Sequence, residues 1–162
     1  MMKWFILIGL ILAIFAVGCT TNTDKECTDG NTCNVQEIEE TTALEINKDV
    51  EKIEVYHFHG ASQCFSCRTI KEFAELTVNA YYPDLLESGK MEFKSINVEL
   101  PENNEVVSKY GATGSSLWIG MYINGEFHKE QNTQVWYKVR DESDFISYLK
   151  GFLDKRLAGD LS

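Results

Sequence analysis

Hydrophobic and polar positions divide the chain into three parts. Residues 1–18 are almost entirely apolar, residues 19–49 are mostly polar, and residues 50–158 mix short hydrophobic and polar blocks. Only the third part carries the alternation of a half-buried strand or the 3.6-residue spacing of an amphipathic helix. We therefore predict one folded domain of ordinary size over residues 50–158.

Four segments of this domain have the sequence character of β-strands. They are rich in β-branched and aromatic residues or alternate between apolar and polar positions. An Asn-Gly pair at 124–125, which favours a tight hairpin, separates the last two segments. The predicted strands are 52–59, 91–98, 117–123 and 126–139.

Three further segments are predicted to be helices. The first, 64–81, carries apolar residues at helical spacing, and Pro83 ends it. The second, 101–110, ends at Gly111, and the third opens at Asp141. The apolar positions of the first and third helices are Ile70, Phe73, Ala74, Val78 and Tyr81, and Phe145, Leu149, Phe152 and Leu153. The order β-α-β-α-β-β-α predicts an α/β fold in which a mixed four-stranded sheet is flanked by helices.

The apolar first part predicts a targeting signal. Lys3 precedes a continuous apolar run over residues 4–17, which is shorter than the roughly 20 residues of a membrane-spanning helix. Small residues then lead to Cys19, and this pattern resembles the lipobox of prokaryotic lipoproteins, although Ala16 stands where leucine is usual. We predict that residues 1–18 are a lipoprotein signal and that a lipidated Cys19 anchors the chain to the cell membrane outside the cytoplasm. An uncleaved short anchor is the alternative, with the same location.

The polar second part, residues 19–49, is predicted to be a flexible tether. If its first residue carries lipid, four of the five cysteines remain, an even number that suits disulfides in an oxidising compartment. The simplest pairing joins Cys27 to Cys33 and Cys64 to Cys67, and the two other connectivities stay open. The Cys27–Cys33 pair would be a structural staple or a second redox pair that relays electrons.

The formal net charge of −10 argues against a nucleic-acid-binding protein, because an acidic surface repels phosphates. It also disfavours adhesion to anionic lipid headgroups. The sequence contains no glycine-rich phosphate loop, no HExxH motif and no serine-nucleophile elbow. We therefore expect no nucleic-acid partner and no bound cofactor.

The candidate chemistry lies in Cys64-Phe65-Ser66-Cys67, where the first strand passes into the first helix. A cysteine at a helix N-terminus meets free N–H groups and the positive end of the helix dipole, which favour the thiolate. The two intervening residues let Cys67 reach Cys64 across one helical turn. Cys64 can then attack a disulfide of another protein, and Cys67 can resolve the mixed disulfide. The expected partners are thiols and disulfides of extracytoplasmic proteins and a redox partner in the membrane.

Residues 55–68 resemble the active-site segment of the thioredoxin superfamily, and residues 110–117 with 124–125 are similar to its later loop, strand and hairpin. The resemblance covers about residues 50–158 and implies a thioredoxin-like fold with thiol–disulfide oxidoreductase activity. The Phe-His-Gly segment before the CxxC pair, the Gly-Ser-Ser-Leu loop and Trp136 also resemble a CxxC lipoprotein family, some of whose members bear the name of a nitrophenyl-compound nitroreductase subunit. That activity is not carried over, because the sequence shows no flavin site.

Three positions depart from the usual thioredoxin pattern. Phe65 and Ser66 stand between the cysteines, where the dipeptide tunes the redox potential. Ser116 occupies the place of the expected cis-proline, so Ser115 and Ser116, with Phe65 and Ser66, are predicted to line the substrate groove. Phe58 replaces the buried acid found six residues before the first cysteine of the family.

His59 is the candidate proton acceptor in place of that acid, because it lies five residues before Cys64, near the end of the predicted strand. His57 shares its strand face, and both histidines could instead make ordinary hydrogen bonds. The two thiolates with either histidine could also bind Cu(I) or Zn(II), so a metallochaperone is the main alternative function. A non-catalytic interaction subunit of a redox complex is the third. The oxidoreductase interpretation needs no metal.

Overall fold

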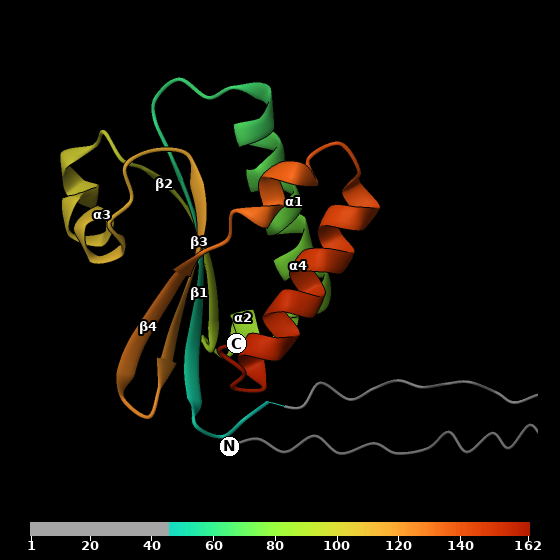
Figure 1. The fold of residues 1–162 in the computed structure, drawn as a ribbon. Coiled ribbons are helices and arrows are strands. Elements are labelled where there is room, and N and C mark those ends of the chain that lie inside the picture. Colours follow the sequence, from blue (N-terminus) through green and yellow to red (C-terminus); the bar gives the residue numbers. More distant parts are fainter. Residues whose placement is uncertain (1–45) are drawn as a thin grey trace, which may run out of the picture. The chain divides into compact units, whose positions relative to one another are not determined.

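The computed structural model describes residues 46–162 (Figure 1). The predicted signal over residues 1–18, most of the predicted tether, the lipidation site Cys19 and the pair Cys27 and Cys33 lie outside the described residues and stay predictions. Within residues 46–162, no helix is both long enough and apolar enough to span a membrane.

A mixed four-stranded sheet forms the centre of the described domain. Its strands are β1 (Val50–His59), β2 (Met91–Asn97), β3 (Ser116–Ile123) and β4 (Glu126–Gln131). In the order β2-β1-β3-β4, β1 and β2 are parallel, whereas β3 runs antiparallel to both β1 and β4. Because parallel strands need a crossover connection, the chain between β1 and β2 passes over one face of the sheet.

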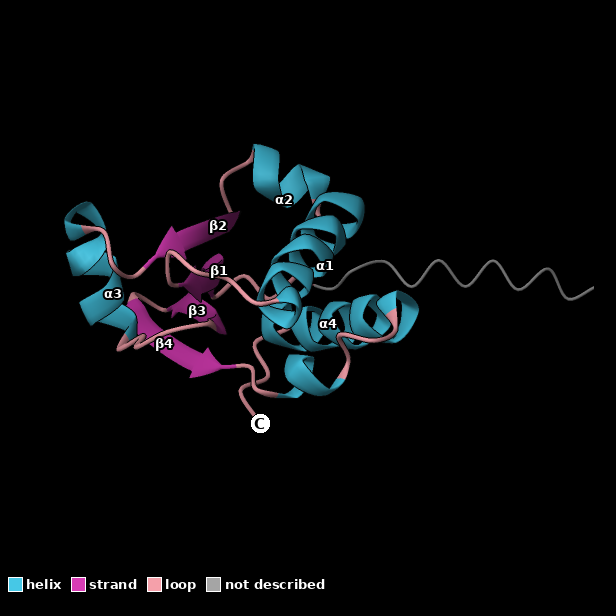
Figure 2. Cartoon of the chain, turned by 90° about the horizontal axis from the view of Figure 1, so that it is seen from above, coloured by secondary structure: helices cyan, strands magenta, loops and turns pink. Residues whose placement is uncertain are grey.

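Helices cover both faces of this sheet (Figure 2). The helices α1 (Phe65–Tyr81) and α4 (Glu142–Leu157) lie side by side on one face, and the shorter α3 (Asn104–Tyr110) lies on the other. The short helix α2 (Pro83–Glu87) continues the crossover from α1 to β2, and the 3-10 helix η1 (Pro101–Asn103) leads into α3. This arrangement confirms the predicted α/β fold with a mixed four-stranded sheet flanked by helices.

Side chains alternate along β1 between two hydrophobic clusters, one on each face of the sheet. Ile53 and Val55 belong to the cluster formed with α1 and α4, and Tyr56 and Phe58 belong to the aromatic cluster formed with α3. The main partners in the first cluster are Ile70, Ala74, Val78, Phe145, Leu149 and Leu153. His57 lies between Tyr56 and Phe58 in the strand, so its side chain points toward the α1 face.

The prediction of one strand over residues 126–139 is wrong. β4 ends at Gln131, and the 3-10 helix η2 (Gln134–Tyr137) follows it. The Asn132 N–H donates to the Leu117 carbonyl at 2.8 Å, and the chain then leaves the sheet so that Val135 joins the cluster under α1 and α4. Val135 and the partly buried Trp136 therefore serve core packing and not strand pairing, whereas Tyr137 is exposed.

The apolar positions predicted for the first helix ended at Tyr81, but the tyrosine that is buried is Tyr82. Tyr81 is 48% exposed, whereas Tyr82 is buried. The Tyr82 hydroxyl donates to the Lys150 carbonyl at 3.0 Å and to an Asp154 carboxylate oxygen at 2.8 Å, which fixes the end of α1 against α4. Pro83 ends α1, as predicted, and also opens α2, because proline is tolerated in a first helical turn.

Candidate thiol site at the start of helix α1

Cys64 is the N-cap residue of α1, where the chain leaves β1 and its connecting loop. Its backbone is extended, with φ −73° and ψ 170°, and its Sγ accepts a hydrogen bond from the Cys67 N–H at 3.3 Å. A sulfur atom thus takes the capping role that a serine or aspartate oxygen usually fills. Arg68 Nη1 donates to the Gln63 carbonyl at 2.8 Å and fastens the loop to the helix. Cys64 is therefore held at the helix N-terminus with its side chain exposed.

Cys67 lies one helical turn later and is only 6% exposed. Its Sγ lies 2.7 Å from the Sγ of Cys64, and both residues are free thiols. A disulfide bond has a length of about 2.05 Å, so a small side-chain adjustment would join the pair. Cys64 is the cysteine that a partner protein can reach, and Cys67 is placed to react with Cys64.

The surroundings of Cys64 lower the pKa of its thiol. The largest cause is the hydrogen bond from the Cys67 side chain, followed by the backbone N–H of Cys67. Both contacts stabilise the negative charge of the thiolate, and the aligned peptide dipoles of α1 act in the same direction. Because the thiolate is the nucleophile in disulfide exchange, this geometry activates the exposed cysteine.

The dipeptide between the cysteines forms the first turn of α1. Phe65 is 71% exposed, and Ser66 is half-buried. A large exposed apolar side chain beside a reactive sulfur offers contact area to a protein partner. The roles of Phe65 and Ser66 in substrate binding stay predictions that this exposure supports.

Ser115 and Ser116 lie where the α3–β3 loop enters the sheet. Ser116 pairs with Phe58, and its Oγ donates to the Gly114 carbonyl at 2.9 Å and accepts from Trp118 Nε1 at 3.1 Å. These contacts place its side chain on the α3 face of the sheet, opposite to α1. Within residues 46–162, no hydrogen bond joins either serine to the cysteines, and every peptide bond there is trans. The role of Ser115 and Ser116 in a substrate groove therefore stays a prediction that these contacts do not support.

His59 lies at the end of β1, half-buried, with Nδ1 2.8 Å from the Gly60 carbonyl. The Nδ1–H is the donor in this contact, because a carbonyl oxygen only accepts. The ring of His59 stacks on that of His57, with centroids 5.5 Å apart and planes 20° from parallel. Within residues 46–162, no hydrogen bond joins the His59 ring to either thiol, so its proton-accepting role stays a prediction.

His57 lies deeper in the domain than His59. It is 1% exposed, and burial, with smaller effects from His59 and Lys71, lowers its pKa to about 4. The backbone of Cys67 lies close to the ring and raises this pKa, but its effect is smaller than that of burial. The alternation of β1 puts both histidines on the α1 face, as their spacing in the sequence indicated.

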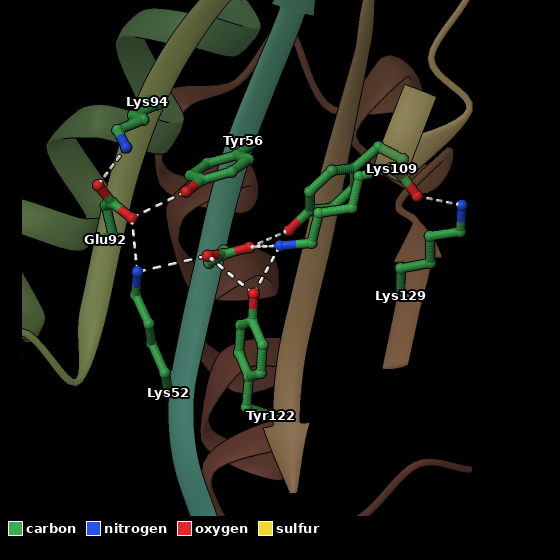
Figure 3. Close-up of polar contacts among 9 residues, drawn as sticks. Lys52, Tyr56, Glu92, Lys94, Lys109, Tyr122 and Lys129 are labelled. Atoms are coloured by element: carbon green, nitrogen blue, oxygen red, sulfur yellow. Dashed lines mark hydrogen bonds and ion pairs between the residues drawn. The ribbon is translucent and has the colours of Figure 1, made fainter. Parts of the chain in front are cut away.

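A second polar cluster, on the α3 face of the sheet, was not foreseen (Figure 3). At its centre, the buried Glu54 accepts hydrogen bonds from Lys109 Nζ and the Tyr110 hydroxyl, both at 2.8 Å. Burial opposes ionisation of Glu54, but these bonds outweigh it and lower the pKa. Lys52 bridges Glu54 to Glu92 at 3.3 and 2.7 Å. The charges of this cluster are mutually paired, so it fastens α3 to the sheet.

The described residues offer little for a metal ion. Within residues 46–162, no group of three or more His, Cys, Asp or Glu side chains is arranged as a set of metal ligands. The alternative of a Cu(I)- or Zn(II)-binding protein is therefore supported by the cysteine pair alone. The thiol geometry favours disulfide exchange as the chemistry of this site.

Comparisons with known proteins concern the fold. No protein-family model and no curated protein matches the sequence. Similar solved structures include the crystal structure of the Trx4 domain of ERdj5, with 17% identity and a TM-score of 0.42, which covers 64% of this chain and 81% of that one. Another is the solution structure of an uncharacterized thioredoxin-like protein from Clostridium perfringens, with 14% identity and a TM-score of 0.38, over 70% of this chain and 90% of that one. The described part of the chain is an α/β domain in which a mixed four-stranded sheet is flanked by helices, and it carries a thiol pair at the start of α1.

Proposed function

We propose that this protein is a membrane-tethered, extracytoplasmic thiol–disulfide oxidoreductase that acts on cysteines of other proteins. The observation that carries the proposal is the geometry of the thiol pair. An exposed Cys64 caps α1 with its sulfur, and the sulfur of the buried Cys67 lies 2.7 Å away. One accessible activated thiol with a second thiol behind it is the arrangement that two-step disulfide exchange requires.

The reaction follows from this arrangement. The Cys64 thiolate attacks one sulfur of a partner disulfide, and the other partner sulfur leaves as a thiolate and takes up a proton. The Cys67 thiol then loses its proton and attacks Cys64 Sγ, which breaks the mixed disulfide and releases the second partner thiol. Two electrons pass from the cysteine pair to the partner, and the reverse sequence oxidises a partner dithiol.

Proteins, and not small thiols alone, are the proposed substrates. The exposed Phe65 lies beside the reactive sulfur and provides apolar contact for a polypeptide. A lipidated Cys19 followed by a tether would hold the domain near the membrane and raise its effective concentration toward a membrane redox partner. The lipobox-like sequence supports this location.

The test of the chemistry is the redox behaviour of the pair. We expect the full chain, equilibrated in glutathione buffers, to show a reversible two-electron couple that Cys64→Ser and Cys67→Ser each abolish. Cys27→Ser with Cys33→Ser is the matched control and should leave this couple in place. Stoichiometric binding of Cu(I) or Zn(II) that blocks both thiols, with no reversible couple, would contradict the proposal.

The location has a separate test. Expression of the chain in a bacterium fed with a labelled fatty acid should label the protein, and Cys19→Ser should remove the label and release the protein from the membrane fraction. Label that persists in the Cys19→Ser protein would argue against the lipid anchor without affecting the redox chemistry.

A further inference from the structure

The turn between β3 and β4 contains Asn124-Gly125, the only Asn-Gly pair in the sequence. Both residues are exposed and adopt left-handed backbone conformations, with φ values of 53° and 77°. Glycine and asparagine tolerate this conformation better than other residues, so the pair suits a tight hairpin. The same pair is chemically labile, because glycine has no side chain to shield its backbone nitrogen from the asparagine amide beside it.

Two groups at the start of β1 bind the backbone of this turn. The Asn124 N–H donates to the Asp49 carbonyl at 3.1 Å. The Gly125 N–H donates to Oε1 of the Glu51 carboxylate at 2.9 Å. The turn is therefore held from outside the hairpin, and its glycine nitrogen is bound through its only proton.

The carboxylate of Glu51 reaches the turn through an irregularity of β1. The register of β1 against β3 shifts between Val50 and Lys52, so Glu51 has no partner in β3. A β-bulge of this kind changes the direction of a side chain. Here the Glu51 side chain meets Gly125, 74 residues away in the sequence. The bulge thus brings a carboxylate to the one labile asparagine–glycine peptide of the chain.

We propose that Asn124 is a site of spontaneous deamidation and that Glu51 suppresses this reaction in the folded protein. The reaction begins when the Gly125 nitrogen loses its proton and attacks Cγ of Asn124. The new C–N bond closes a five-membered succinimide, and the side-chain nitrogen takes up the proton and leaves as ammonia. Water then opens the ring to aspartate or isoaspartate. The net change is hydrolysis of one amide to a carboxylate, with no oxidation or reduction.

The hydrogen bond to Glu51 opposes the first step of this reaction. The proton in the bond is the one that Gly125 must lose, and a carboxylate is too weak a base to remove it from an amide. The succinimide has no N–H at residue 125, so the bond has to break before the ring closes. The negative charge of Glu51 also disfavours the anion that forms at the nitrogen. Both effects slow deamidation while the turn is held against β1.

Deamidation would alter the hairpin and leave the thiol pair in place. The new carboxylate at residue 124 would lie next to the N–H that binds Glu51, so the two negative charges would repel each other. Isoaspartate would also add a methylene group to the backbone of a turn whose geometry is fixed. The hairpin adjoins the first residue of β1, whereas the thiol pair follows the last of its ten residues, about 30 Å away. This inference is therefore independent of the proposed function.

The test follows deamidation of the full chain at pH 8 by mass spectrometry. Trypsin releases residues 110–129 as one peptide, which contains no other asparagine and no glutamine, so its deamidation reports Asn124 alone. Glu51→Ala removes the acceptor of the Gly125 N–H. Glu126→Ala is the matched control, because it removes a carboxylate beside the same turn that does not bind Gly125. The parent chain unfolded in guanidinium chloride gives the rate without protection by the fold.

We expect Glu51→Ala to deamidate about fivefold faster than the folded parent and Glu126→Ala to stay within about twofold of it, because only the first loses a hydrogen bond to the reacting nitrogen. Glu51→Gln, which keeps a neutral acceptor, should fall between the parent and Glu51→Ala. The unfolded parent should react fastest. A rate in Glu51→Ala equal to or below that of the parent would overturn the proposal, as would an unfolded chain that stays unmodified. Loss of the thiol couple in the unmodified parent would instead count against the proposed function.

Discussion

Acid should destabilise this protein through His57 before it does so through the carboxylates. Burial lowers the pKa of His57 to about 4, against an ordinary value of 6.5. Between these two values the unfolded chain binds a proton at this position and the folded protein does not. Stability contributed by the neutral ring is therefore fully present above pH 6.5 and is lost as the pH falls toward 4.

The size of the effect follows from the two pKa values. At about 1.36 kcal/mol for each pKa unit, the difference between 6.5 and 4 corresponds to about 3 kcal/mol of unfolding free energy. The carboxylates act in a lower window. Burial opposes ionisation of Glu92, but hydrogen bonds from Lys52, Lys94 and Tyr56 lower its pKa to about 2, so its contribution is lost only below pH 4.5.

The assay is urea unfolding of the full chain, followed by tryptophan fluorescence, at pH values from 7.5 to 3. We expect the free energy of unfolding to fall by about 2.4 kcal/mol between pH 7 and 4.5, with most of this slope absent in His57→Gln. His59→Gln is the control and should keep the slope. A slope that His57→Gln leaves unchanged, or a His57 pKa near 6.5 measured by NMR titration of the folded protein, would refute the reasoning.

Three further predictions follow from the described contacts. The rate of Cys64 alkylation by iodoacetamide can be measured against pH in a chain whose cysteines outside the pair are replaced. The pKa obtained for the Cys64 thiol should lie below its ordinary value. Cys67→Ala should raise this pKa, because the main hydrogen bond to the Cys64 sulfur is lost. Glu54→Gln should lower the unfolding free energy by roughly 2 kcal/mol in thermal melts, because Lys109 loses its charged partner; an unchanged melt would show that the cluster is not stabilising. Gly120→Ala should destabilise by about 2 kcal/mol or more, because the new methyl group overlaps the Tyr110 hydroxyl, and Tyr110→Phe in the same chain should recover part of the loss.

Apart from the short helix α2, the elements of residues 50–125 were predicted well because their signals are local. The strand and helix periodicities, the Asn-Gly hairpin and the CxxC pair at a strand–helix junction all lie within short segments. Asn124 and Gly125 adopt positive φ values of 53° and 77°, as a tight hairpin requires. The fold class therefore followed from the order of elements alone.

The features that were missed depend on contacts between distant segments. Val135 is buried by helices α1 and α4, and nothing in residues 134–137 distinguishes such a buried turn from a strand. Glu54 looks like a solvent-facing strand residue until Lys109 and Tyr110 arrive from α3. The deeper burial of His57 relative to His59 likewise depends on tertiary packing, which sequence spacing does not show.

The two buried polar side chains of β1 also constrain how the strand can align during folding. Glu54 and His57 are three residues apart and lie on opposite faces of the sheet, each with partners from a different strand or helix. A shift of β1 by one residue would exchange the two faces. Glu54 would then enter the aliphatic layer beneath α1 without a cation, and His57 would meet the aromatic layer beneath α3. Misaligned β1 is thus penalised twice, so insertions or deletions within this strand should be tolerated far less than changes in the loops around it.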